Sequence, residues 1–172
     1  MENRTRVFML RHWQERMRTT NSGRWAGLVL SRCEIVDHGV PGAPLDFSRI
    51  PTSGAAVLFP SPAGGITSPL PQTLVVLDAT WAQARRMLQR IPELQRLPRL
   101  SLPGVLAERL RRPTVKSGMS TIEALAAALD LLGDAEAARA LTQAWQLAVE
   151  RGLSLRRSVE RRDAMRAESS AP

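Results

Sequence analysis

The side chains best suited to chemistry follow the clearest strand signal in this sequence. Residues 74–77 form a continuous aliphatic run bounded by turn signals, and Asp78, Thr80 and Trp81 come directly after it. Ligands of open α/β sheets bind beyond the carboxyl ends of the strands, so Asp78 stands where a catalytic carboxylate is expected. Structural roles stay open, because Asp and Thr are good helix N-caps and Trp packs well in a core.

Two arginines lie within one helical turn of these residues. Arg85 and Arg86 follow Trp81, and on a helix they would place positive charge beside Asp78. Arginine charge at this place suits the phosphates of a nucleic acid. The alternative is that both arginines belong to a solvated helix face.

Two polar turns could present hydrogen-bonding groups to a ligand. Residues 120–123, Ser-Thr-Ile-Glu, match a capping box, in which Glu123 reaches back to the N-cap residue. The same helix start would also offer N–H groups and hydroxyls to a polar ligand. Residues 21–24, Asn-Ser-Gly-Arg, form a similar turn that either binds a carboxylate or ammonium group or simply begins a helix.

Few side chains compete with the carboxylates for the role of general base. The sequence has no tyrosine and only two histidines, His12 and His38. Glycine-rich phosphate loops, zinc-protease helices and nucleophile elbows are not found. Cys33 is the single cysteine, and its apolar neighbours favour a buried thiol over a nucleophile. One cysteine also excludes an intramolecular disulfide and a thiolate metal cluster.

Apolar periodicity and turn residues locate the elements that must position these groups. Asn21 or Ser22 would cap the first helix, Pro92 would stop the second, and the last helix would run from an Asp134 cap to about Gly152. Loops rich in Gly and Pro occupy residues 39–55 and 61–72, and a basic loop or turn occupies 108–118. Strands are predicted at residues 7–10, 33–36, 56–59, 74–77 and 100–102, and helices at 25–30, 82–90, 121–132 and 135–150.

This alternation of strands and helices indicates an α/β fold with a mostly parallel sheet and flanking helices. The unbroken apolarity of residues 74–77 is typical of a parallel strand that is covered on both faces. A length of 172 residues fits one domain. We assign residues 1–153 to that domain and residues 154–172 to a basic tail, partly helical or disordered.

The net charge favours a polyanionic partner. Lysine and arginine together number 24, Lys116 is the only lysine, and the formal charge is +8. Arginine pairs with phosphate oxygens and stacks on bases, so RNA or DNA is the first candidate. An arginine-rich proteome would explain why the basic residues are arginine rather than lysine, but it explains the net excess of positive charge less well. The sequence shows neither a signal core nor an apolar run of about 20 residues, so we expect a cytoplasmic protein with no membrane partner.

Four blocks of this sequence, taken together, resemble the DTW-domain family of tRNA-uridine aminocarboxypropyltransferases. They occur in the family's order and are distributed over most of residues 7–130. The most specific block is Asp-Ala-Thr-Trp followed by Ala-Gln-Ala-Arg-Arg-Met. The blocks are His12–Arg24 (HWQERMRTTNSGR), Leu58–Ser61 (LFPS), Leu77–Met87 (LDATWAQARRM) and Ser120–Ala124 (STIEA).

The resemblance implies a fold and a reaction. Members have a SPOUT-like α/β domain with a deep C-terminal knot that cradles the cofactor. They transfer the 3-amino-3-carboxypropyl group of S-adenosylmethionine to N3 of a uridine in tRNA, and methylthioadenosine leaves. The uridine N3 must lose its proton in this reaction, and Asp78, a carboxylate at a strand end, is our candidate for the base.

The resemblance also assigns binding residues. The amino-acid end of S-adenosylmethionine would be held by Asn21, Ser22 and Gly23. The adenosine would be enclosed by Leu58, Pro60, Ser61, Leu102, Ser120 and Thr121. For the RNA we expect phosphate contacts from Arg24, Arg85, Arg86 and Arg112, and further substrate contacts from Thr80, Trp81 and Glu123. The arginine-rich tail, residues 156–166, would add non-specific affinity.

Two departures from the family pattern bear on these expectations. Many relatives carry an N-terminal cysteine cluster that could bind zinc; this chain has none, so we predict no metal. Trp13 replaces a common proline after His12, and Ser22 replaces a threonine while keeping the hydroxyl. Two other functions stay open: a SPOUT-like RNA methyltransferase with the opposite cofactor pose, and an RNA-binding module without catalysis.

Overall fold

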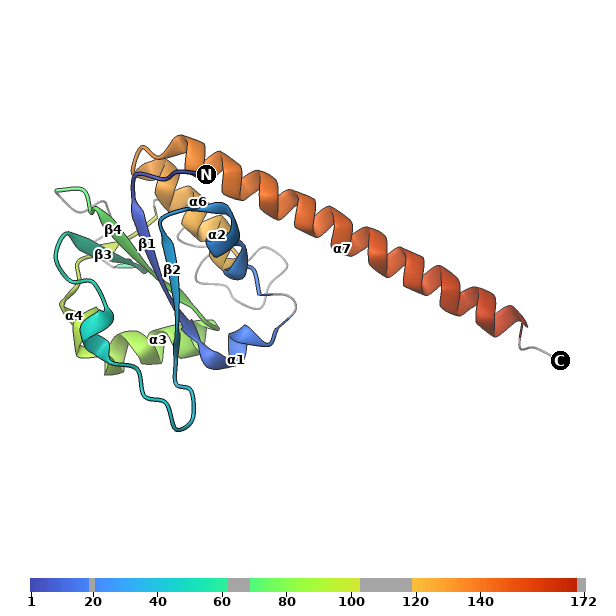
Figure 1. Ribbon diagram of the computed structural model, residues 1–172, viewed down its shortest axis with the longest axis horizontal. Helices are drawn as coiled ribbons and strands as arrows, with labels where there is room; N and C mark the ends of the chain where they lie inside the picture. Colours follow the sequence, from blue (N-terminus) through green and yellow to red (C-terminus); the bar gives the residue numbers. More distant parts are fainter. Residues whose placement is uncertain (19–20, 62–68, 103–118, 170–172) are drawn as a thin grey trace.

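Five parallel strands form one sheet in the computed structural model of this chain (Figure 1). The strand order is β2-β1-β4-β3-β5. The structure describes residues 1–18, 21–61, 69–102 and 119–169, with side chains in the last range as far as residue 152. The strands are β1 Arg6–His12, β2 Cys33–His38, β3 Ala55–Leu58, β4 Thr73–Asp78 and β5 Arg99–Leu100.

Helices cover both faces of the sheet (Figure 1). One face packs against α2 (Arg24–Val29), α6 (Thr121–Leu131) and the first turns of α7 (Ala135–Ser169). The other face packs against α3 (Trp81–Arg90) and α4 (Pro92–Arg96). The short helix α1 (Trp13–Arg16) follows β1, and a 3₁₀ turn (Phe47–Arg49) lies in the loop after β2. The predicted α/β fold with a parallel sheet is therefore confirmed.

The alternation of side chains along the strands divides the core into two layers. Val7 and Met9 of β1 belong to the cluster beneath α6, whereas Phe8 and Leu10 belong to the cluster beneath α3. Every residue of β4 is buried, as expected for a central parallel strand covered on both faces. The same alternation continues to the strand ends, where it decides which polar side chain lies on which face.

The structure differs from the sequence predictions at the helix ends. Pro92 was expected to stop α3, which does end at Arg90, but Pro92 is also the first residue of α4. Proline is favoured at this position, because the first helical N–H has no partner to lose. Helix α2, for which Asn21 or Ser22 was the expected cap, has Gly23 as its N-cap, while Asn21 Oδ1 accepts from the Arg24 N–H.

The last helix is longer than predicted. It was expected to end near Gly152, but α7 continues to Ser169 and extends away from the sheet (Figure 1). An interior glycine costs a helix only about 1 kcal/mol, so it need not end one. The expected Asp134 cap lies just before α7, and its Oδ2 also accepts from the backbone N–H groups of Arg4 and Thr5.

Some predictions stay untested by the fold. The SPOUT relationship and the C-terminal knot stay predictions, as does the division into a domain of residues 1–153 and a tail. The predicted basic loop at 108–118 and the side chains of residues 156–166 lie outside the described part of the chain. Within that part, no helix is both long and apolar enough to cross a membrane.

Candidate active site

A row of three charged side chains crosses the carboxyl end of the sheet on the face covered by α6. Arg11 of β1 is in register with Asp37 of β2 on one side and with Asp78 of β4 on the other. Arg11 Nε donates a 2.7 Å hydrogen bond to Asp37 Oδ1, and Arg16 Nη1 lies 3.6 Å from Asp37 Oδ2. Asp37 is thus paired with two arginines, and Asp78 is bound by other partners.

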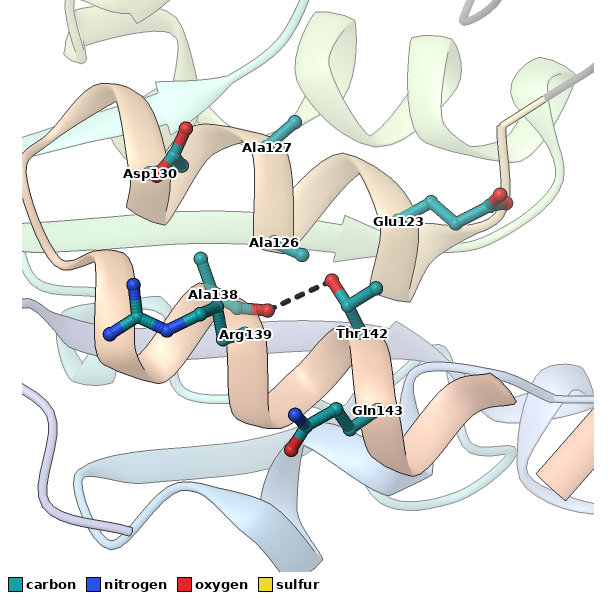
Figure 2. Close-up of a pocket in the computed structure, with 8 residues that line it drawn as sticks. All are labelled: Glu123, Ala126, Ala127, Asp130, Ala138, Arg139, Thr142 and Gln143. Carbon is teal, nitrogen blue, oxygen red and sulfur yellow. Dashed lines mark hydrogen bonds between the residues drawn. The ribbon is translucent and has the colours of Figure 1, made fainter. Parts of the chain in front are cut away.

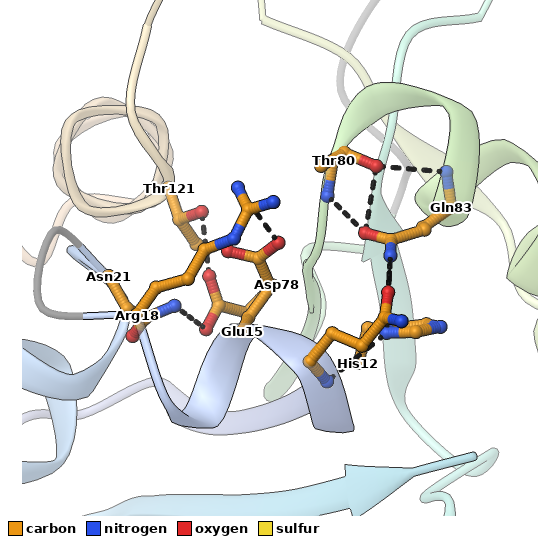
Figure 3. A network of polar contacts seen from close by, with 9 residues as sticks. His12, Glu15, Arg18, Asn21, Asp78, Thr80, Gln83 and Thr121 are labelled. Atoms are coloured by element: carbon orange, nitrogen blue, oxygen red, sulfur yellow. Dashed lines mark hydrogen bonds and ion pairs between the residues drawn. The ribbon is translucent and has the colours of Figure 1, made fainter.

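Asp78 is buried where three segments meet (Figure 3). Its side chain is at the end of β4, and the residue is only 2% exposed. Asn21 Nδ2 donates to Oδ2 at 2.7 Å, and Thr121 Oγ1, at the start of α6, donates to Oδ1 at 2.9 Å. Burial raises the pKa of Asp78, although these two hydrogen bonds and nearby Arg11 oppose the rise. The carboxylate is therefore a stronger base than an exposed aspartate.

The helix-capping role that the sequence left open for Asp78 belongs to Thr80. Thr80 is the N-cap of α3 and forms a capping box with Gln83. Gln83 Oε1 accepts from the Thr80 N–H at 2.9 Å, and Thr80 Oγ1 accepts from the Gln83 N–H at 3.4 Å. Asp78 is consequently free to use both oxygens for tertiary contacts.

Gly23 brings the turn before α2 against this carboxylate. A Cβ added to Gly23 would lie 2.5 Å from Asp78 Cγ, which is closer than any real contact. Its φ of −62° is one that any residue adopts, so space rather than backbone conformation requires glycine here. Asn21, Ser22 and Gly23, which were predicted to hold a ligand together, are all buried, and Asn21 and Gly23 lie directly beside Asp78.

Glu15 is a second buried carboxylate, which the sequence analysis did not single out. It is 7% exposed, and its Oε1 is buried with no hydrogen-bond partner in the described part of the chain. Arg18 Nη1 lies 3.4 Å from that oxygen as an ion pair (Figure 3). Burial raises the pKa of Glu15, Arg18 opposes the rise, and the charge of Asp78 adds to it. The i, i+3 spacing of Glu15 and Arg18 inside the first matching block was the available signal.

The Trp81 side chain packs against neighbouring side chains and does not project from this site as a free ring. Its ring stacks on Phe59 with centroids 5.0 Å apart and planes 6° from parallel. The Arg85 guanidinium lies 5.8 Å from the Trp81 centroid, and that of Arg99 lies 5.9 Å from the Phe59 centroid. These contacts support the packing role that was left open for Trp81.

The residues predicted to enclose the adenosine lie around the same sheet edge. Leu58 and Leu102 are buried in the core layer beneath α6. The Ser61 N–H donates to Ser101 Oγ at 3.3 Å, which places the segment after β3 beside the segment after β5. Pro60 is partly exposed there.

The capping box at the start of α6 is formed as expected. Ser120 Oγ accepts from the Glu123 N–H at 3.4 Å, and Glu123 Oε2 accepts from the Ser120 N–H at 2.8 Å. Glu123 also lines a groove of about 540 Å³ between α6 and α7 (Figure 2). In that groove Thr142 Oγ1 donates to the Ala138 carbonyl within α7.

The predicted phosphate-binding arginines are spread over the surface. Arg24, Arg85 and Arg86 are exposed, and Arg24 lies 6.0 Å from the Trp25 centroid. Arg112 lies outside the described residues. Among the described residues, no group of three or more His, Cys, Asp or Glu side chains is placed to hold a metal ion.

Comparison with known protein families decides where this chain belongs. The model of the DTW domain matches residues 1–153. The chain belongs to the DTW domain family. This is the domain family of tRNA-uridine aminocarboxypropyltransferases, so the predicted family is confirmed. The DTW match spans the whole sheet and the Asp78 site. No solved structure matches the chain.

Proposed function

We propose that this DTW protein transfers the 3-amino-3-carboxypropyl group of S-adenosylmethionine to N3 of a uridine in tRNA and releases methylthioadenosine. The family match supports a tRNA-modifying transferase. The observation that carries the specific reaction is Asp78, a buried carboxylate with a raised pKa at the carboxyl end of the central strand. Catalytic groups of parallel sheets are expected at that edge.

Asp78 acts as the general base in this mechanism. A uridine N3–H is a weak acid and must lose its proton as the nitrogen attacks carbon. An ionised carboxylate has about four lone-pair positions, so the bonds from Asn21 and Thr121 leave Asp78 able to accept a further proton. The raised pKa brings the carboxyl closer to the value that suits a base at neutral pH. The two hydrogen bonds also hold the side chain in one orientation.

The residues around Asp78 fit a cationic co-substrate. Glu15 contributes a second buried carboxylate, whose Oε1 has no hydrogen-bond partner among the described residues beyond its 3.4 Å ion pair with Arg18, and an ammonium group would add one. Asn21, Ser22 and Gly23 would hold the same amino-acid end. The adenosine would be enclosed by Leu58, Pro60, Ser61, Leu102, Ser120 and Thr121. S-adenosylmethionine, when bound, supplies a positively charged sulfur that activates the neighbouring carbon.

The protein surface supports RNA as the second substrate. The formal charge of the chain is +8, and Arg24 beside Gly23 and Arg85 and Arg86 of α3 are exposed. Arginine contacts to phosphate would orient the tRNA without reading its sequence. The bound uridine must then lie within hydrogen-bond reach of Asp78.

The reaction can be tested in cells and in vitro. Mass spectrometry of tRNA nucleosides from cells with and without this protein should show aminocarboxypropyl-uridine only when the protein is present. Purified protein with tRNA and S-adenosylmethionine should release methylthioadenosine. Release of S-adenosylhomocysteine would instead indicate a methyltransferase. Binding of tRNA without any affinity for S-adenosylmethionine would indicate a non-catalytic RNA-binding module.

A further inference from the structure

A small basic cavity lies on the face of the sheet opposite Asp78. His12 and His38 are register partners at the ends of β1 and β2, one residue beyond Arg11 and Asp37. Because strand side chains alternate, the two histidines lie on the α3 face. They line a cavity of about 130 Å³ together with Gln83, Met87, Arg86 and Arg90 of α3, and none of these lining residues is acidic.

A hydrogen-bond network sets the orientation of His12 (Figure 3). Gln83 Oε1 is occupied by Thr80, so its Nε2 points to Gln14 Oε1 at 2.9 Å and to His12 Nδ1 at 3.3 Å. The Gln14 N–H also donates to His12 Nδ1 at 3.4 Å. These donors make Nδ1 the unprotonated nitrogen of the neutral ring, so the proton resides on Nε2. His12 therefore keeps an N–H for a ligand.

His38 has an unpaired nitrogen beside the same cavity. Its Nδ1 is buried with no hydrogen-bond partner in the described part of the chain, and its ring lies 5.9 Å from Phe47. A buried polar atom of this kind calls for a partner, which an oxygen of a bound ligand would supply.

Arg86 and Arg90 place two positive charges at the cavity, and none of its lining residues is acidic. Burial lowers the pKa of His12, and the charges of His38 and Arg86 lower it further. Burial also lowers the pKa of His38. The nearest carboxylate along β2, Asp37, lies on the other face and is paired with Arg11 and Arg16. A bound anion would compensate the two arginine charges and favour the protonated form of both histidines.

We propose that this cavity binds a phosphate group of the RNA substrate through His12, His38, Arg86 and Arg90. Its volume of about 130 Å³ is roughly that of four water molecules, which suits one phosphate rather than a whole nucleotide. Arginine guanidinium groups bind phosphate oxygens bidentately. The inference rests on the proposed function, because it makes the cavity the backbone anchor for the nucleotide at Asp78.

The position of the cavity suits this role. Arg11, which neighbours Asp78 in the sheet, and His12, which lines the cavity, are consecutive residues. The cavity and Asp78 therefore lie on opposite faces of one sheet edge, and an RNA chain crossing that edge meets both. The phosphate anchor would keep the target base at the carboxylate.

Histidine NMR tests the cavity independently of catalysis. The sequence has only two histidines, so the two ring signals can be assigned with the His12→Gln and His38→Gln variants. Inorganic phosphate should raise the pKa of both rings and do so saturably, while chloride at equal ionic strength should not. Addition of tRNA should displace the phosphate and produce the same direction of shift. The proposal would be overturned if phosphate left the pKa of both histidines unchanged, or if tRNA did not displace the bound phosphate.

Binding measurements test the arginines. Arg86→Gln/Arg90→Gln should weaken tRNA binding about tenfold or more and reduce the salt-dependence slope by about 1. Arg96→Gln/Arg151→Gln removes the same two charges from exposed arginines outside the cavity and should change binding far less. Equal effects of the two changes would show general charge loss and overturn the proposal. These measurements require no group transfer. The phosphate-site proposal can therefore be confirmed even if the proposed reaction is wrong, and it can be wrong even if the reaction is confirmed.

Discussion

Thr121 Oγ1 donates a 2.9 Å hydrogen bond to Asp78 Oδ1 and thereby joins the first residue of α6 to the last residue of β4. The two residues are 43 positions apart in the sequence, so this bond is a tertiary contact. Together with the bond from Asn21 it gives each Asp78 oxygen one fixed donor. The catalytic proposal depends on this arrangement.

Thr121→Val should destabilise the protein and alter its pH profile. The loss of a hydrogen bond to a buried carboxylate costs about 1.5–3 kcal/mol, which urea unfolding at neutral pH would measure. Because the bond lowers the pKa of Asp78, its loss should raise that pKa and move the acid limb of kcat/KM to higher pH. Thr121→Ser keeps the hydroxyl and should behave like the wild type. Equal stability of the two variants would contradict the role of this bond.

Asp78→Asn should abolish transfer while leaving the affinity for S-adenosylmethionine within a few-fold of the wild type. The amide keeps an oxygen for the Thr121 hydroxyl but cannot accept the uridine proton. Methylthioadenosine release and calorimetric binding would measure the two effects separately. Asp130→Asn makes the same change at an exposed position of α6 and is the matched control. Full activity of the Asp78 variant would remove this residue from the base role.

Gly23→Ala should disturb the site by a steric clash. The new Cβ would meet Asp78 Cγ at 2.5 Å, so the carboxylate or the turn must shift. We expect a loss of stability of about 1–3 kcal/mol, typical of overpacking, and a fall in kcat. Thermal unfolding and steady-state kinetics would measure both. A variant with unchanged kcat would show that the position of Asp78 tolerates displacement.

Glu15→Gln should change the pH dependence of stability. Burial raises the pKa of Glu15, so its favourable contribution is complete below its ordinary pKa and is lost as pH rises through the raised value. Glutamine resembles the protonated acid, so the variant should match the wild type at acidic pH and become the more stable of the two at neutral and higher pH. Urea unfolding across that range would measure the difference. A variant that is less stable at pH 8 would show that the Arg18 ion pair outweighs burial.

Gly152→Ala should strengthen α7 without affecting the site. A Cβ at Gly152 would meet no atom within 4 Å, and alanine favours an interior helical position by about 0.5–1 kcal/mol. Circular dichroism and amide hydrogen exchange should show more helix and slower exchange after residue 152. This variant is also the control for Gly23→Ala, because it adds the same methyl group in open space. Unchanged helicity would contradict a continuous helix through Gly152.

Local sequence determined much of the architecture. The aliphatic run at residues 74–77 specified a central parallel strand, because such a strand must be apolar on both faces. The spacing of Ser120 and Glu123 specified a capping box, because both partners lie within one helical turn. The matching sequence blocks likewise identified the family without any coordinates. These features depend only on residues close together in the chain.

Strand order and register decided which side chains surround the candidate site residues. Asp78 meets Asn21 from 57 residues away and Thr121 from 43 residues away, and no local pattern encodes those distances. The burial of Glu15 and the pairing of His12 with His38 likewise appear only when β1 lies between β2 and β4. Local hydrogen bonds follow from spacing along the chain, whereas the environment of a side chain follows from which distant segments pack around it.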